Sequence, residues 1–323
     1  MILPYTLRLV FLCFACFFLV QAVFGLASWA GTTGAIRAAE TMGPRSAARF
    51  LLLLRLLPGT LAAFAVAVLC IPSYLLLETN APGERVGLLC SAAALLGAAI
   101  SIRSLARVAR VLWISARHNS VCLREGQNME EAGRSSILVM NGERPVMALT
   151  GVIRQRIVVS RALLQALSGE ELDAALDHER AHHKSRDNLK RLMMAMAPEI
   201  FPFSRLFARL ERSWARFTEY AADDEAAAGD SRRSVSLASA LVNVARMGGP
   251  GAVPELASSL LEDNDELAWR VERLLSPAPA REETRSRAFF TIAAVAIAVA
   301  AITLALQPLT LNLAHTLLEH LVR

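Results

Sequence analysis

Residues 168–188 read SGEELDAALDHERAHHKSRDN, and the organisation of the chain follows from this stretch. Ser168 and Glu171 have the three-residue spacing of a capping box, which predicts that a helix begins here. After the cap, apolar residues recur at helical spacing: Leu172, Ala175, Leu176 and Ala181. We therefore predict a helix with one apolar side and charged flanks.

The predicted helix contains an H-E-x-x-H motif formed by His178, Glu179 and His182. Two residues four positions apart lie on nearly the same face of a helix, about 6 Å apart along its axis. Their imidazoles can bind one ion together, and Zn²⁺ favours such nitrogen ligands. Glu179 follows the first ligand directly, where it can act as a general base. The alternative is a chance group of polar side chains on a solvated helix face. The cap, the periodicity and a candidate third ligand favour zinc.

The candidate third ligand lies on a second long helix, predicted over about 204–228, whose end reads FTEYAADDEAAAGD. Catalytic zinc sites normally have three protein ligands and one open position. We favour Glu219 as the third ligand. Asp223, four residues further on the same face, can then accept the N–H of a ligating imidazole. The competing acids are Asp224 and Glu225, and all four carboxylates could instead simply solvate the helix end.

The composition predicts a membrane protein. The chain has 323 residues, of which 54% are hydrophobic, and a mean hydropathy of +0.40, which is too apolar for an ordinary soluble enzyme. Crossing a bilayer takes about 20 apolar residues. Stretches of about this length occur at about 9–29, 56–77, 86–102 and 288–306. We therefore predict four membrane spans.

The arginines predict the orientation of these spans. They are concentrated between the first two spans, directly after the third and directly before the last, whereas the connection between the second and third holds only Arg85. The expected location is a bacterial-type inner membrane. By the positive-inside rule, residues 104–287 lie on its cytoplasmic side and both termini lie outside. The alternative for the first span is a cleaved signal peptide, which would place the following connection outside.

The cytoplasmic segment should form an α+β domain, because short β-like runs at 136–140, 146–149 and 156–160 precede the capped helix. The run RQRIVVS (154–160) could form an exposed sheet edge that binds an extended peptide by strand addition, or a plain structural hairpin. The apolar run 191–207 is interrupted by two prolines and too short to span. It should lie on the membrane surface or pack under the domain.

The run LSGEELDAALDHERAHHKSRDNL, followed by EYAAD, resembles the membrane-bound gluzincin peptidases of the BlaR/MecR signal-transducer type, over about residues 85–287. HtpX-like peptidases and CAAX prenyl proteases are more distantly similar. The resemblance implies zinc bound by His178, His182 and Glu219, Glu179 as the general base, and Asp223 as the support of a ligand.

In the prenyl-protease relatives, the segment that RVERL (270–274) resembles contributes an arginine near the substrate, and the resemblance assigns this role to Arg270. The alternative is an ordinary arginine on a helix surface. The fold class expected is a multi-span α-helical membrane protein with an α+β gluzincin-type metallopeptidase domain. Its parts are three transmembrane helices in 1–103, the peptidase domain in 104–287, and a fourth span with a short extracytoplasmic tail in 288–323.

The function expected is zinc-dependent endoproteolysis in regulation or signalling, with a transcriptional repressor or the protein itself as the substrate that the resemblance implies. One alternative is quality control or processing by an HtpX-like or CAAX-protease-like peptidase. Another is a non-catalytic transducer braced by zinc. Cleavage within the bilayer is disfavoured by the charged residues of 177–187. The tail 307–323 contains no S-x-x-K, so direct β-lactam sensing is not expected.

The expected partners are the lipid bilayer, a protein or peptide substrate and, as a further candidate, a second copy of the chain. The net charge of +5 does not require nucleic acid, because the arginines cluster at span ends where anionic lipid can compensate them. No compact basic recognition helix stands out, so direct nucleic-acid binding is not expected.

Overall fold

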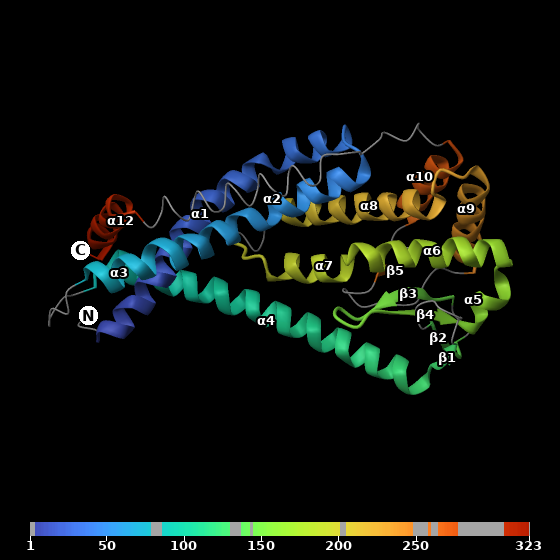
Figure 1. Cartoon of the computed structure of the whole chain (residues 1–323), viewed down its shortest axis with the longest axis horizontal. Helices are drawn as coiled ribbons and strands as arrows, with labels where there is room; N and C mark the ends of the chain where they lie inside the picture. Colours follow the sequence, from blue (N-terminus) through green and yellow to red (C-terminus); the bar gives the residue numbers. More distant parts are fainter. Residues whose placement is uncertain are drawn as a thin grey trace.

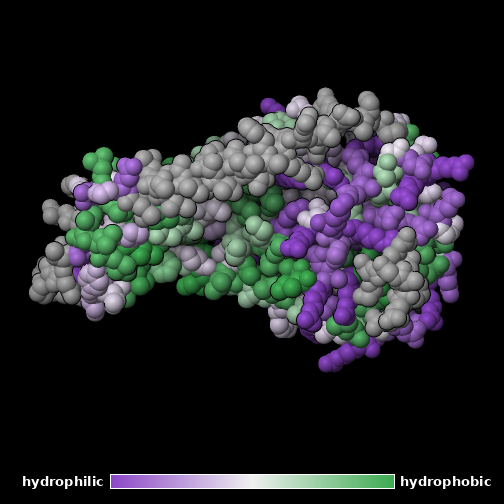
Figure 2. All heavy atoms as spheres, viewed as in Figure 1, coloured by the Kyte–Doolittle hydropathy of each residue, from purple (hydrophilic) through white to green (hydrophobic). Residues whose placement is uncertain are grey.

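The computed structural model describes residues 4–78, 86–129, 137–142, 145–200, 205–247, 258–259, 264–276 and 307–322. The predicted fourth span, 288–306, lies outside these residues. Figure 1 shows an elongated molecule in which long helices extend from one end, while a small sheet and several shorter helices form the other. In Figure 2, hydrophobic residues predominate on the coloured surface of the end that contains the long helices, and hydrophilic residues predominate on the end that contains the sheet.

Among the described residues, three helical stretches are long and apolar enough to cross a membrane. They are α1 (Tyr5–Glu40), α2 (Pro44–Phe64) continued through the π-helical turn η1 (Ala65–Cys70) into α3 (Ile71–Leu77), and α4 (Leu88–Glu125). Three of the four predicted spans are thus confirmed. The helix α1 is about 54 Å long, against roughly 30 Å for the hydrocarbon core of a bilayer. The spanning helices therefore continue out of the bilayer and form part of the framework of the domain.

In the described part of the chain the sheet has five strands: β1 (Gln127–Met129), β2 (Ile137–Met140), β3 (Met147–Thr150), β4 (Arg156–Ser160) and β5 (Ser258–Ser259). Their order is β1-β2-β4-β3-β5, with β2 and β4 parallel and the other pairs antiparallel. The strand β4 is therefore central. The predicted strand addition at RQRIVVS is wrong, because β2 and β3 already pair with both edges of β4.

The remaining described helices are α5 (Arg161–Ala166), α6 (Gly169–Ser185), α7 (Asp187–Met196), α8 (Arg205–Ala227), α9 (Ser231–Arg246), α10 (Asn264–Leu275) and α12 (Pro308–Val322). The predicted capping box is present at the start of α6, with Ser168 and Glu171 bonding each other's backbone N–H. The main core joins Leu149 and Ile157 of the sheet to Ala175 of α6 and to Leu237 and Leu241 of α9. One side of α6 is thus fixed against the sheet and α9.

A short stretch after α7, which we call the 197–200 segment, is bound by the spanning helices. Buried Arg55 of α2 contacts Glu199 at 2.7 Å and the carbonyl oxygen of Ala197 at 3.3 Å. Arg107 of α4 contacts the same two groups at 2.9 and 3.1 Å. Arg55 also pairs with Glu211 of α8 at 2.9 Å. Charge-assisted contacts of this kind are stronger than neutral ones, so this segment ties α7 and α8 to two spans.

The helix α1 approaches the same segment closely. Gln21 of α1 donates a hydrogen bond of 3.1 Å to the carbonyl oxygen of Pro198. A Cβ atom added at Gly59 of α2 would lie 2.9 Å from the ring of Pro198, and one at Gly25 of α1 would lie 3.1 Å from Ile200. The described part of the run 191–207 therefore packs against all three spanning helices.

Candidate metal centre

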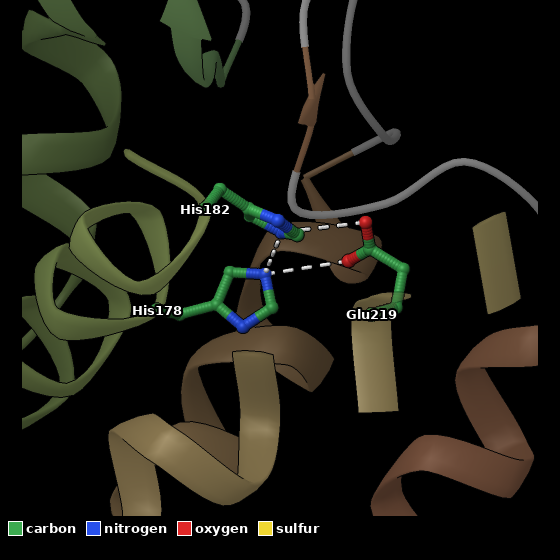
Figure 3. Close-up of side chains that lie close together, drawn as sticks. All are labelled: His178, His182 and Glu219. Atoms are coloured by element: carbon green, nitrogen blue, oxygen red, sulfur yellow. Dashed lines mark hydrogen bonds and ion pairs between the residues drawn. The ribbon is translucent and has the colours of Figure 1, made fainter. Parts of the chain in front are cut away.

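Two helices that lie side by side bring three predicted ligands together. The helix α6 supplies His178 and His182, and α8 supplies Glu219; the three residues are 0, 0 and 2% exposed. The two Nε2 atoms lie 3.1 Å apart. The Oε2 atom of Glu219 lies 3.3 Å from the Nε2 of His178, and its Oε1 atom lies 3.4 Å from the Nε2 of His182. Figure 3 shows the three side chains pointing toward one another.

These distances fit a tetrahedral ion. Zinc binds nitrogen and carboxylate oxygen at about 2.0–2.2 Å, which sets neighbouring ligand atoms about 3.3 Å apart at tetrahedral angles. With the ring proton of each neutral histidine on Nδ1, the atom that faces a carboxylate, both Nε2 atoms present lone pairs toward the carboxylate of Glu219. Three buried acceptors at such distances repel one another unless a cation lies between them. The residues therefore fit a metal ion, and among the described residues no other group of three does.

Each imidazole is held by its own carboxylate. The Nδ1 of His178 lies 2.9 Å from Asp223, as the sequence predicts for that acid. The Nδ1 of His182 donates to Asp187 at 2.8 Å, an interaction that the sequence analysis missed. Asp187 is the first residue of α7 and follows Arg186, whose backbone is left-handed with φ 55°. Helical periodicity cannot reveal this contact because the helix ends between the two partners.

Arg270 is buried at the centre, on α10. Its guanidinium binds both carboxylate oxygens of Asp223, at 2.7 and 2.9 Å, and lies 3.3 Å from Glu219. The alternative prediction of a surface arginine is therefore wrong, because α10 presents this side chain inward between two acids. Arg191 of α7 adds a second cation, 3.9 Å from Glu219.

Burial and charge shift the pKa values of these groups. Burial alone would raise the pKa of Asp223, but Arg270 and His178 outweigh it and lower that pKa to about 2. Burial would lower the pKa of His182, but Glu219 and Asp187 raise it to about 10. Burial raises the pKa of Glu179 against the pull of the histidines. Within the described chain neither carboxylate oxygen of Glu179 has a hydrogen-bond partner, so a buried acid is left available beside the metal ligands.

The competing acids lie elsewhere. Asp224 binds Arg273 at 2.6 and 2.7 Å, and Glu225 pairs with Lys184. His183 is exposed, as expected for a side chain about 100° around the helix from its neighbour. Neither Asp224 nor Glu225 belongs to the group formed by the two histidines and Glu219.

A buried site of two histidines and a carboxylate, carried by helices that pack against membrane-spanning ones, defines the class of membrane metallopeptidases. The model of the BlaR1 peptidase M56 family matches residues 80–274, which is more than half of the chain. The chain belongs to this family.

One curated relative matches a shorter stretch. A protein named Protease HtpX homolog, from Archaeoglobus fulgidus (strain ATCC 49558 / DSM 4304 / JCM 9628 / NBRC 100126 / VC-16), is 43% identical over 44 residues. The match covers 14% of this chain and 13% of that protein, so the similarity is local.

Proposed function

We propose that the chain is a zinc metalloendopeptidase of the membrane that hydrolyses peptide bonds of a protein substrate in regulatory or signalling proteolysis. The observation that carries this proposal is the convergence of three buried ligand groups, from His178, His182 and Glu219, beside the carboxylate of Glu179, which has no hydrogen-bond partner among the described residues. Family membership supports peptidase activity, and the nitrogen-rich ligand set favours zinc among the common metals.

When bound, zinc would supply a Lewis acid for the scissile carbonyl group and an acidified water. Glu179 accepts a proton from the water that attacks the carbonyl carbon and later returns it to the leaving amine. Its raised pKa suits this role, because a base whose pKa approaches the working pH both takes up and releases protons readily. Asp223 and Asp187 hold the two imidazoles in the tautomer that leaves each Nε2 free to bind metal.

Three ligands rather than four favour catalysis over a purely structural role. Structural zinc sites are usually closed by four protein ligands, whereas catalytic sites keep one position open. Within the described part of the chain, the group contains three metal-ligating side chains. A hydroxamate-type inhibitor should therefore bind the zinc-loaded protein, and failure to bind would favour the non-catalytic, zinc-braced transducer.

We propose two candidate classes of substrate. The resemblance to signal transducers favours a transcriptional repressor or the chain itself as substrate, with the metal centre facing the cytoplasm and both termini outside. The local similarity to the HtpX homolog supports quality control or processing as the second candidate. Comparing the proteomes of cells that carry the parent and cells that carry a Glu179→Gln form would identify the substrate directly.

The experiment that tests the catalytic proposal is Glu179→Gln in the purified full-length protein. We expect the zinc content to stay near one ion per chain, because Glu179 is not a ligand. Cleavage of the identified substrate should fall by roughly 10²–10⁴-fold, the usual contribution of a general base. Zinc content is measured by mass spectrometry of the metal, and cleavage by product analysis.

The matched control is Asp224→Asn, because Asp224 is a neighbouring acid outside the ligand group. It should keep both zinc and turnover. Full activity in the Glu179→Gln protein would exclude Glu179 as the base. A parent protein that binds no zinc would remove the proposal altogether.

A further inference from the structure

The helix α4 continues well past the third membrane span. The apolar stretch of this span ends near residue 102, and 23 residues of the helix, 103–125, follow it. At 1.5 Å per residue this extension is about 34 Å long. It holds five arginines, and its first acidic residue is Glu125 at its very end. A surface on which one sign of charge is in excess attracts a partner of the opposite sign.

Four of these arginines form a stripe along the extension. They recur every seven residues: Arg103, Arg110, Arg117 and Arg124. Seven residues make nearly two helical turns, so the four side chains share one face. All four are exposed, and no acidic side chain among the described residues pairs with them. The fifth, Arg107, points toward the domain and contacts Glu199. The stripe therefore presents uncompensated positive charge to its surroundings.

An exposed tryptophan lies between two arginines of the stripe. Trp113 follows Arg110 by three residues and precedes Arg117 by four, so the three side chains are neighbours on the helix surface. Trp113 is 63% exposed, and the guanidinium of Arg117 lies 5.7 Å from the centre of its ring. On the adjoining surface, Leu105 and Leu112 are exposed as well. Arginine, tryptophan and leucine side by side on an exposed helix are typical of a membrane interface.

The direction of α4 turns this surface toward the bilayer. Ser104 faces the domain, because its hydroxyl donates to the carbonyl oxygen of Met196. Trp113 lies nine residues further, which is two and a half turns, and so points to the outer side. Figure 1 shows α4 diverging from α1 and α2, so that it leaves the bilayer obliquely and its outer side is inclined toward the membrane. Helical side chains also lean toward the N-terminus, which is the membrane end of α4.

We propose that the surface formed by Arg110, Trp113 and Arg117 binds anionic lipid headgroups of the bilayer. The two guanidinium groups contact lipid phosphates, and the indole ring lies at the level of the headgroups. This surface continues directly from a membrane span on the same helix, and its charge is complementary to anionic lipid. A second copy of the chain is a poorer partner, because it would bring the same arginines and repel them.

The test places the zinc-loaded full-length protein in nanodiscs that contain phosphatidylcholine and phosphatidylglycerol. One lipid at a time carries bromine near the headgroup end of its acyl chains, where it quenches the fluorescence of a tryptophan that it contacts. The part of the quenching that Trp113→Phe removes belongs to Trp113. Titrating each brominated lipid against the other, unbrominated one gives their relative affinities for the surface around this ring.

We expect both brominated lipids to quench Trp113 and phosphatidylglycerol to bind at least about fivefold more tightly, the effect of one basic side chain near an anionic membrane. Arg110→Gln combined with Arg117→Gln should reduce this preference to about one and leave quenching by phosphatidylcholine in place. The matched control is Arg232→Gln combined with Arg246→Gln. It removes the same charge from two exposed arginines of α9, which Figure 1 places at the end away from the long helices, and should keep the preference.

Two results would overturn the proposal. If neither brominated lipid quenches Trp113, the ring lies outside the bilayer; a smaller number of chains per particle in Trp113→Phe would then assign the surface to a second copy. If phosphatidylglycerol has no advantage in the parent, or keeps it in the double variant of Arg110 and Arg117, these arginines do not bind headgroups.

Discussion

At the scale of single residues, the two carboxylates that hold the imidazoles decide how strongly the metal binds. Asp223 and Asp187 belong to different helices, α8 and α7, so each histidine is oriented by an element other than its own. A carboxylate partner fixes the imidazole tautomer and raises the basicity of the ligating nitrogen. Both supports should therefore contribute to metal affinity although neither contacts the metal.

Asp187→Asn tests this at the support that the sequence did not reveal. An amide oxygen still accepts the imidazole N–H but carries no negative charge, so we expect zinc affinity to fall by about 10- to 100-fold. The measurement is a competition titration with a zinc-binding dye. The control is Asp177→Asn, at a partly exposed acid of α6 that pairs with Arg180. Equal affinities in both variants would contradict the role of Asp187.

The raised pKa of His182 predicts how metal binding depends on pH. With a pKa of about 10 in the metal-free protein, His182 carries a proton at neutral pH that zinc must displace. Apparent zinc affinity should therefore rise with pH, by about tenfold per unit for each proton released, between pH 6 and 8. The same dye titration, repeated across this range, measures the slope. A pH-independent affinity would mean that no proton leaves the site.

At the scale of elements, the packing of α1 against α4 depends on one glycine. A Cβ atom added at Gly97 of α4 would overlap the carbonyl oxygen of Phe14 in α1. Real Cβ atoms do not approach backbone so closely, so the two helices would have to separate.

Gly97→Ala should therefore lower the free energy of unfolding by about 1–3 kcal/mol, the range for overpacked sites. Gly34→Ala in α1 is the control, because nothing lies within 4 Å of the added atom there. It should be neutral or stabilising by up to about 1 kcal/mol, since alanine favours helix. Unfolding in detergent, followed by circular dichroism, compares the two. A loss of the same size in both would show that helix crossing is not the cause.

Local signals explain which elements could be predicted from the sequence. The cap at Ser168, the H-E-x-x-H motif and the Glu219–Asp223 spacing all lie within one or two helical turns, so periodicity suffices to find them. The position of β4 depends on parallel pairing with β2, and such pairing between separate segments leaves no mark in either strand.

The contacts that were missed are those between elements. The burial of Arg270 depends on how α10 packs against α8, and the contact between Asp187 and His182 depends on a left-handed turn between two helices. Neither contact can be recognised from the composition of the sequence or from the spacing of its residues. The three described spans could be predicted from hydropathy, because each contains a long apolar stretch.

At the scale of the whole molecule, Arg55 connects the spanning helices to the helices of the metal centre. It is 2% exposed and holds Glu199, Glu211 and the carbonyl oxygen of Ala197. Removing one partner of a buried ion pair leaves the other charge uncompensated, which typically costs about 3–5 kcal/mol.

Arg55→Met should therefore destabilise the protein by roughly 3 kcal/mol. Because the 197–200 segment lies between α7 and α8 in the chain, proteolytic activity should fall together with stability. Thermal unfolding and substrate cleavage are measured in parallel. Arg37→Met, at an exposed arginine in the last turn of α1, should change neither. Unaltered stability in Arg55→Met would show that the ion pairs contribute little.

The contacts of the 197–200 segment with the spans also make peptide hydrolysis depend on insertion of the chain into the membrane. The three spans that bind it precede it in the chain, so the ribosome delivers them to the bilayer before Glu199 and the glutamate ligand emerge. A chain that failed to insert would offer its downstream half no correctly arranged partners, and the two histidines would have no fixed third ligand to meet. Newly made molecules stranded in the aqueous compartment should therefore be inert, which protects the proteins around them from unwanted cleavage.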